Sequence, residues 1–378
     1  MVIGIKDGVK LFGISVVCFC AVFVCTFFLN YYIDALAIDG AVTGELRVLY
    51  DANMTSAKFT CAITGGVLCL IAVVMTVFYI KLFIDGNAKR FGILKAMGYS
   101  DGKIALSFWV FGLSTLIGAG AGYGAGHAIM PLIYREMTID GMPAITINYH
   151  VELLIALVIA PTILFSAFAC LYAKLSLRRN VVSMIKGGKA AAKSKRRSSD
   201  KPHSFLTDMC LSTLAGKKSV VFFVAFACFC YSAMLQMGLT MSDLSSVIMG
   251  VMIFVIGVVL GVTALFMAIT TAVNANKSNI AVMKAFGYSN KERSLSLLAG
   301  YVPFALLGFA IGTVYQHVLM TVMVNVVFAD VKTVATYSFG VGYFFITLGT
   351  FIVLYSCAMA TYALRINRVP IKEIMSNE

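Results

Sequence analysis

The residues in this sequence that could hydrolyse a nucleotide or hold a metal ion lack the spacing that such chemistry needs. The segment from Gly216 to Ser219 has neither the earlier glycine nor the Gly-Lys-Ser/Thr ending of a phosphate-binding loop. The Cys-Phe-Cys segments that begin at Cys18 and Cys228 have no accompanying histidines, and we interpret them as small apolar packing positions. No Ser/His/Asp or zinc-protease signature is found in the sequence. We therefore predict no catalytic residue, no metal site and no cofactor bound by the chain, which is not expected to be an enzyme.

A short polar segment occurs twice, and its residues have the types and spacing of an amphipathic helix that ends in a tight turn. The first copy, Asn87–Ser100, reads NAKRFGILKAMGYS, and the second, Asn276–Ser289, reads NKSNIAVMKAFGYS. Each copy lies between two long apolar runs. One copy alone is explained by a surface helix that only joins two membrane spans, whereas two copies in matching positions favour a shared function.

Each copy carries apolar residues at positions i, i+3 and i+6, which lie on one face of a short helix. These residues are Phe91, Leu94 and Met97 in the first copy and Ile280, Met283 and Phe286 in the second. Lys95 and Lys284 face elsewhere, so each copy is amphipathic.

Each copy also carries its own stop and restart signals. Gly98 and Gly287 are placed where a residue in the left-handed conformation would end the helix. Ser100 and Ser289 are placed to cap the next helix, and Ser289 has Glu292 three residues later, as in a capping box. We expect the chain to stop, turn and start a new helix at both places.

The composition shows that these segments are set in a membrane protein. Of the 378 residues, 60% are hydrophobic and 12% are charged, and the mean hydropathy is +0.91. So few charges cannot cover the surface of a soluble domain. Apolar runs long enough to cross a bilayer extend roughly over Leu11–Leu29, Phe59–Ile80, Ala105–Gly126, Leu153–Tyr172, Val220–Gln236, Val247–Val273, Leu295–Gln316 and Phe339–Tyr362. We predict an all-α polytopic membrane protein with about eight transmembrane helices.

The distribution of charge predicts the orientation of the chain. The net charge is +13. With the N-terminus inside, basic residues such as Lys89, Arg90 and Arg365 fall on one side, whereas acidic residues such as Asp34 and Asp140 fall on the other. This positive-inside pattern predicts a protein of the cell membrane with both termini on the cytoplasmic side. We therefore expect the basic residues to meet membrane lipids rather than nucleic acid.

The two halves of the chain repeat beyond the copied segment. Gly98 and Gly287 lie 189 residues apart, and the Gly-xxx-Gly pairs of the following spans lie 190 apart. The Cys-Phe-Cys segments lie 210 apart, so about twenty extra residues are assigned to the first outer loop, Asn30–Lys58. We predict two tandem four-helix repeats, each with one of the copied cytoplasmic segments, and small outer loops. The predicted parts are a first unit, residues 1–185, a basic cytoplasmic linker, residues 186–210, and a second unit, residues 211–378.

Small residues in the third span of each half predict close helix packing. They are Gly118, Gly122, Gly308 and Gly312, which have small-xxx-small spacing. His127 and His317 follow at matching positions, and both a ligand-binding or pH-sensing role and a plain interfacial hydrogen bond are left open. The spans otherwise hold almost no ionisable side chains, which weakens the case for a proton- or sodium-coupled carrier.

A long second span, an amphipathic segment ending in Leu-Lys-Ala-Met-Gly-Tyr-Ser, two further spans and an Arg-rich exit resemble the FtsX-like permease family of ABC transporters. The resemblance covers nearly the whole chain, once per half. It implies a separate cytoplasmic ABC ATPase, in two copies, that binds ATP and Mg²⁺, and it equates the two copied segments with the family's coupling helices. The residues that it assigns to this contact are Arg90, Phe91, Leu94, Lys95, Met97 and Gly98 in the first copy, and Ile280, Met283, Lys284, Phe286 and Gly287 in the second.

Two departures from the family pattern bear on this assignment. The family usually has an acidic residue where this chain has Arg90 and Asn279, which implies a rewired ATPase contact. The large extracytoplasmic domain that many members carry between their first two spans is missing, because Asn30–Lys58 and Met237–Ser246 are too short to hold it.

The resemblance implies a permease subunit of an ATP-driven transporter. Short outer loops and an apolar interior favour efflux or extraction of a hydrophobic or amphipathic substrate, such as a peptide, a lipid or a drug-like molecule. Two alternatives stay open: a non-transporting mechanotransmission or sensing subunit, which predicts an outer partner, and an ATP-independent carrier or scaffold.

Overall fold

The fold is described from a computed structural model of the chain. The residues that the structure describes are 12–137, 143, 145–178, 180–185, 214, 218–244, 247–276, 280, 283–289, 292, 299–327 and 337–367. Within these residues the regular elements are helices, and eight of them are long and apolar enough to cross a membrane. The predicted all-α polytopic membrane protein is therefore confirmed. The predicted linker, residues 186–210, lies outside the described residues.

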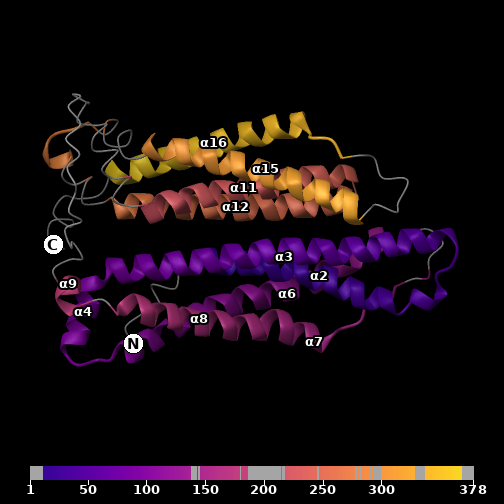
Figure 1. Ribbon diagram of the computed structural model, residues 1–378, viewed down its shortest axis with the longest axis horizontal. Coiled ribbons are helices and arrows are strands. Elements are labelled where there is room, and N and C mark those ends of the chain that lie inside the picture. Colours follow the sequence, from indigo (N-terminus) through magenta and orange to yellow (C-terminus); the bar gives the residue numbers. More distant parts are fainter. Residues whose placement is uncertain are drawn as a thin grey trace. The chain divides into compact units, whose positions relative to one another are not determined.

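The chain divides into two compact units, one made mainly of residues up to Val181 and the other mainly of residues from Val182 onward. In unit 1 the helices α2, α3, α6 and α8 run alongside one another (Figure 1). The elements of this part of the chain are α2 (Phe12–Leu36), η2 (Asp39–Ala41), α3 (Glu45–Gly86), α4 (Ala88–Ala96), α5 (Asp101–Leu106), η3 (Ser107–Trp109), α6 (Val110–Met137), α7 (Val151–Leu154), the π-helical η4 (Ile155–Ile159), α8 (Ala160–Leu177) and α9 (Val181–Ile185). α2 packs against both α3 and α6, and α8 packs against the same two helices.

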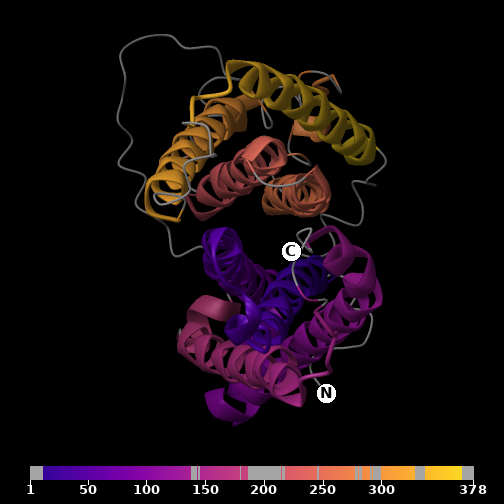
Figure 2. The same cartoon turned by 90° about the vertical axis from the view of Figure 1, so that its right-hand side faces the viewer.

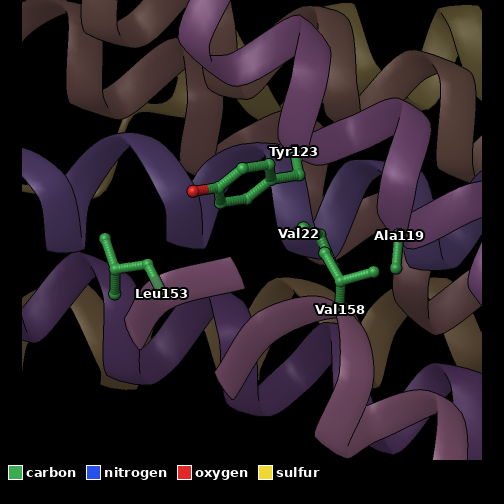
Figure 3. Packing of buried hydrophobic residues seen from close by; sticks show 5 residues of the cluster. All are labelled: Val22, Ala119, Tyr123, Leu153 and Val158. Atoms are coloured by element: carbon green, nitrogen blue, oxygen red, sulfur yellow. The ribbon is translucent and has the colours of Figure 1, made fainter. Parts of the chain in front are cut away.

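A buried apolar cluster holds the start of the fourth span against the first and third. It consists of Val22 from α2, Ala119 and Tyr123 from α6, Leu153 from α7 and Val158 from η4 (Figure 3). Only 17% of the most apolar stretch of this fourth span is buried. The rest of its surface is apolar and exposed, as expected for a helix that faces lipid.

Glycines bring α2 and α6 into backbone contact. A Cβ atom at Gly118 would overlap the carbonyl group of Ser15, and a Cβ atom at Gly122 would overlap that of Phe19. The two helices therefore approach more closely than any larger residue at these positions would allow, which is the usual role of small-xxx-small spacing in membranes.

Unit 2 contains four long helices that also run alongside one another (Figures 1 and 2). Its elements are α11 (Lys218–Leu244), α12 (Val247–Ala275), η5 (Ala299–Tyr301), α15 (Val302–Val327) and α16 (Val341–Asn367). Glycines again meet a neighbouring backbone: Cβ atoms at Gly308 and Gly312 would overlap the carbonyl groups of Ala225 and Phe229 of α11. These two carbonyls lie 210 residues after the ones that the α6 glycines contact.

Buried polar side chains add hydrogen bonds to the packing of unit 2. The Gln236 Nε2 atom of α11 donates to Thr313 Oγ1 at 2.8 Å and to Ser232 Oγ at 2.9 Å. The Tyr231 hydroxyl donates to Thr350 Oγ1 of α16 at 3.1 Å. Because α11 is buried along most of its length, these groups need partners within the bundle, and the bonds fix the register of α11 against its neighbours.

One prediction about unit 1 is wrong. The residues Asn30–Lys58 were expected to form an outer loop, but α2 continues to Leu36 and α3 begins at Glu45. The helix extends this far because it has an apolar face: Tyr50, Met54, Ala57 and Cys61 are all buried, at the spacing of one helical stripe. The Tyr50 hydroxyl also donates to the carbonyl of Ala35 at 2.9 Å. The extra residues therefore lengthen α3, which has 42 residues.

Candidate functional site

The first copied segment is a short helix set between α3 and α5. α3 ends at Gly86 and α4 begins at Ala88, so only Asn87 separates them. At the other end of α4 the backbone N–H of Tyr99 donates to the carbonyl of Leu94 at 3.1 Å. Gly98 has a φ of +90°, and its N–H donates to the carbonyl of Lys95 at 3.0 Å. This pair of bonds around a left-handed glycine is the Schellman arrangement.

The second copied segment ends in the same way. Gly287 has a φ of +79°, its N–H donates to the carbonyl of Lys284 at 3.2 Å, and the N–H of Tyr288 donates to the carbonyl of Met283 at 3.1 Å. The predicted left-handed glycines are therefore confirmed in both copies. Residues 277–279 and 281–282 of this segment lie outside the described residues.

The predicted caps that follow each turn are also confirmed. Ser100 is the N-cap of α5, and its Oγ atom accepts from the N–H of Lys103 at 3.4 Å. Ser289 and Glu292 form a reciprocal capping box, with Ser289 N–H donating to Glu292 Oε2 at 2.9 Å and Glu292 N–H donating to Ser289 Oγ at 3.3 Å. The hydrogen bonds from the Ser289 side chain and backbone lower the pKa of Glu292. Each cap fixes the direction in which the chain leaves its turn.

The apolar face that was predicted to dock onto a partner is largely turned inward. Phe91 is only 1% exposed, and its ring centroid lies 6.2 Å from those of both Phe83 and Phe108. Ile280 and Met283 are buried as well. These three side chains are buried against their own part of the chain, so little of their surface is exposed to a groove on another protein.

The outward face of the first segment contains residues that the i, i+3, i+6 pattern did not include. Met97 is 65% exposed and Ile93 is 48% exposed. Lys89 and Arg90 are exposed on the same helix, and Leu94 lies at the border between the two faces. The i, i+4 pair of Ile93 and Met97 was the signal that could have identified this face. In the second segment Phe286 is 75% exposed.

Lys95 links the first segment to the end of the fourth span. Its Nζ atom donates to the carbonyl of Leu177 at 2.7 Å and lies 2.9 Å from Asp101 Oδ1. The Lys95 side chain is only 12% exposed. α4, the last turn of α8 and the first turn of α5 are therefore joined through one ammonium group. Lys284, the matching residue, is partly buried.

A polar cluster at the far end of unit 1 was not predicted. The buried carboxylate of Asp34 accepts from His150 Nε2 at 2.9 Å, from Asn30 Nδ2 at 2.8 Å and from the Tyr134 hydroxyl at 3.0 Å. The backbone N–H of Asn148 donates to it at 3.3 Å. A buried charge requires this number of donors. The cluster ties the residues before α7 to the ends of α2 and α6.

The two matching histidines lie among aromatic side chains. His127 Nδ1 is 3.2 Å from the carbonyl of Tyr123, and its ring centroid lies 4.5 Å from that of Tyr123 and 5.3 Å from that of Tyr149. His317 Nδ1 is 3.4 Å from the Tyr337 hydroxyl. Among the described residues, no group of three or more His, Cys, Asp and Glu side chains is placed to hold a metal ion.

The eight apolar helices define a multi-pass membrane protein, and two of its polar segments end in matching turns. The family model for the C-terminal part of FtsX-like permeases matches the chain twice, over residues 62–181 and 251–371. These matches cover well over half of the sequence, and the chain belongs to the FtsX-like permease family of ABC transporters.

A curated relative supports the same class. The uncharacterized ABC transporter permease MG064 of Mycoplasma genitalium is 27% identical to this chain over 118 residues. The aligned part is 31% of this chain and 9% of that protein, so the chain matches a small fraction of the relative's length. No solved structure matched the chain.

Proposed function

We propose that this chain is the membrane-spanning subunit of an ATP-driven ABC transporter and that Asn87–Ser100 and Asn276–Ser289 are the segments on which a separate cytoplasmic ATPase acts. One observation carries the proposal: both segments end in the same turn and expose a large apolar side chain beside it. Met97 and Phe286 directly precede the turn glycines, and both are mostly exposed.

Exposed apolar side chains at these places need a partner other than lipid. Met97 and Phe286 fall outside the candidate membrane spans. In water, each leaves apolar surface that an apolar groove on a partner protein would remove from solvent. A short helix with such a side chain at its end suits helix-in-groove docking. The buried residues Phe91, Ile280 and Met283 would then serve to hold the docking helices on their own units.

The presence of two such segments suggests that one chain engages two copies of the ATPase. The proposed units are residues 1–185 and 211–378, joined by a basic linker at 186–210. The double match of one family model and the recurrence of the glycine-to-carbonyl contacts support an origin by tandem duplication. ATP and Mg²⁺ would be bound by the ATPase alone.

The same arrangement suggests how the ATPase would move the helices and which class of substrate would be transported. Closure of the ATPase pair would shift each segment together with the helices to which it is fixed, as near-rigid bodies. The basic side of the chain would face the cytoplasm and anionic lipids of the cell membrane, with both termini on that side. A hydrophobic or amphipathic substrate, exported or extracted from the bilayer, suits the apolar helices.

Co-purification with the ATPase tests the proposal. The tagged chain, purified from its native membrane, is expected to retain an ABC ATPase identified by mass spectrometry. Met97→Asp plus Phe286→Asp should lose it while the protein keeps its elution volume and melting temperature, since both side chains are exposed. Val182→Asp is the matched control, because Val182 is an exposed apolar residue on α9, outside the candidate spans.

Equal ATPase recovery with the wild type and the Asp double variant would reject the coupling function. Loss of the ATPase in the Val182→Asp control would show that the readout reports general damage, and the conclusion would then depend on single variants of Met97 and Phe286.

A further inference from the structure

We propose that the first coupling segment binds the ATPase through a cationic surface that fits a groove rimmed by carboxylates, and that the second segment, which has no cations at the two matching positions, does not share this charge contact. This inference rests on the coupling function proposed above. The two segments end in the same turn, but the residues at two matching positions of their sequences differ in charge.

The first segment presents its cations beside its apolar docking residues. At 100° per residue, the positions of Lys89, Arg90, Ile93 and Met97 fall within an arc of about 100° on α4. All four side chains are exposed. We call these four residues the cationic coupling surface. A partner that covers Ile93 and Met97 must therefore also meet Lys89 and Arg90.

The contacts of the opposite face of α4 prevent the helix from rotating, so Lys89 and Arg90 stay exposed. Phe91 is buried between the rings of Phe83 and Phe108. Lys95 is bonded to the carbonyl of Leu177 and paired with Asp101. Rotating α4 would break the aromatic packing and these polar contacts together. The two exposed cations are thus fixed in place, and Lys95 adds no charge to the docking surface.

The second segment lacks matching cations in its sequence. Ser278 and Asn279, which lie outside the described residues, occupy the positions that match Lys89 and Arg90. The exposed residues that the structure describes near its turn are Ala285, Phe286, Gly287, Ser289 and Glu292. The segment's own lysines, Lys277 and Lys284, lie at other positions than those of Lys89 and Arg90. A pair of carboxylates placed to meet Lys89 and Arg90 would find no cation at the matching positions of the second segment.

The cationic coupling surface favours a protein partner that has carboxylate side chains at the rim of its groove. Charges at the rim of a docking site change the rate of association and its salt dependence, and like charges there are strongly unfavourable. A groove that buries Ile93 and Met97 brings its rim against Lys89 and Arg90, so acidic side chains at that rim would favour binding and basic ones would oppose it. Anionic lipid headgroups are the other source of negative charge, and the experiment separates them.

The test measures ATPase binding to the full chain in nanodiscs made only of zwitterionic lipid, as a function of NaCl concentration. The wild type is expected to bind less tightly as salt rises. Lys89→Glu plus Arg90→Glu should bind at least about tenfold more weakly at low salt, with a shallower salt dependence. Lys103→Glu plus Arg178→Glu is the matched control, since both residues are exposed cations outside this surface.

The outcomes of this test are distinct from those for the coupling function. If Met97→Asp plus Phe286→Asp loses the ATPase while Lys89→Glu plus Arg90→Glu binds like the wild type, the coupling function stands and the charge inference is overturned. A defect seen only in nanodiscs with anionic lipid would assign the cations to the membrane and would also overturn it. A similar loss in the control pair would show that overall charge matters and not this surface.

Discussion

The ammonium group of Lys95 lies 2.7 Å from the carbonyl oxygen of Leu177, the last residue of α8. The carbonyls in the last turn of a helix have no partner within the helix, and a cation there also interacts favourably with the helix dipole. The same ammonium pairs with Asp101, so Lys95 joins α4 to the beginning of the third span and to the end of the fourth. A shift of α4 therefore acts on two membrane spans at once.

Replacing Lys95 with Met should loosen this junction while leaving the exposed surface of α4 unchanged. We expect faster amide hydrogen exchange in α4 and in the last turn of α8, equivalent to about 1–3 kcal/mol of local stability, because the charged donor is lost. Mass spectrometry of exchanged peptides measures this. Lys89→Met is the control, since Lys89 is exposed on the same helix. Equal exchange in the two variants would contradict the assigned role of Lys95.

Phe91 and Ile93 should separate stability from partner binding. Phe91→Ala removes a buried ring and should lower the free energy of unfolding by about 3–5 kcal/mol. Ile93→Ala alters an exposed side chain, so it should change stability by less than about 0.5 kcal/mol and weaken ATPase binding instead. Thermal unfolding in detergent and ATPase co-purification give the two readouts. A stable Phe91→Ala protein with lost ATPase binding would restore the docking role first predicted for Phe91.

Gly118 and Gly120 offer a matched pair on one helix. Gly118→Ala should destabilise unit 1 by about 1–3 kcal/mol, because the new methyl group meets the backbone of Ser15. Gly120→Ala should be neutral or stabilise by up to about 1 kcal/mol, since no heavy atom of the described residues lies within 4 Å of a Cβ there. Melting temperatures in detergent compare them. Equal effects would mean that α2 and α6 are not in backbone contact.

Asp34 should be the most sensitive polar residue at the far end of unit 1. Asp34→Ala leaves several buried donors without an acceptor and should cost about 3–5 kcal/mol. His150→Ala removes one donor among several and should cost less. Limited proteolysis within residues 145–150 and the melting temperature report the two effects. If His150→Ala proves as damaging as Asp34→Ala, the histidine and not the carboxylate organises the cluster.

Features set by local physics could be predicted from the sequence. The eight spans follow from runs of apolar residues, and the turn glycines Gly98 and Gly287 follow from a helix stop signal. The caps at Ser100 and Ser289 depend on residues at most three positions away. Each of these needs only a short stretch of chain to be recognised.

Features that depend on distant contacts could not be predicted. Whether Phe91 or Ile93 of α4 faces inward is decided by Phe83 and Phe108, which belong to other helices. The acceptor role of Asp34 depends on residues about one hundred positions later in the chain. The helical form of the segment first assigned to a loop was signalled by an apolar stripe, but the polar residues between its members obscured that stripe.

The helix α3 is longer than a single membrane crossing requires. At 1.5 Å per residue its 42 residues extend about 63 Å, roughly twice the hydrocarbon thickness of a bilayer. Only Gly65–Gly86 has the apolar composition of a span, so the Glu45 end stands outside the bilayer on the side opposite to α4. One unbroken ladder of backbone hydrogen bonds joins the two ends. A helix of this length keeps its Glu45 end at a fixed distance from the residue where α4 begins.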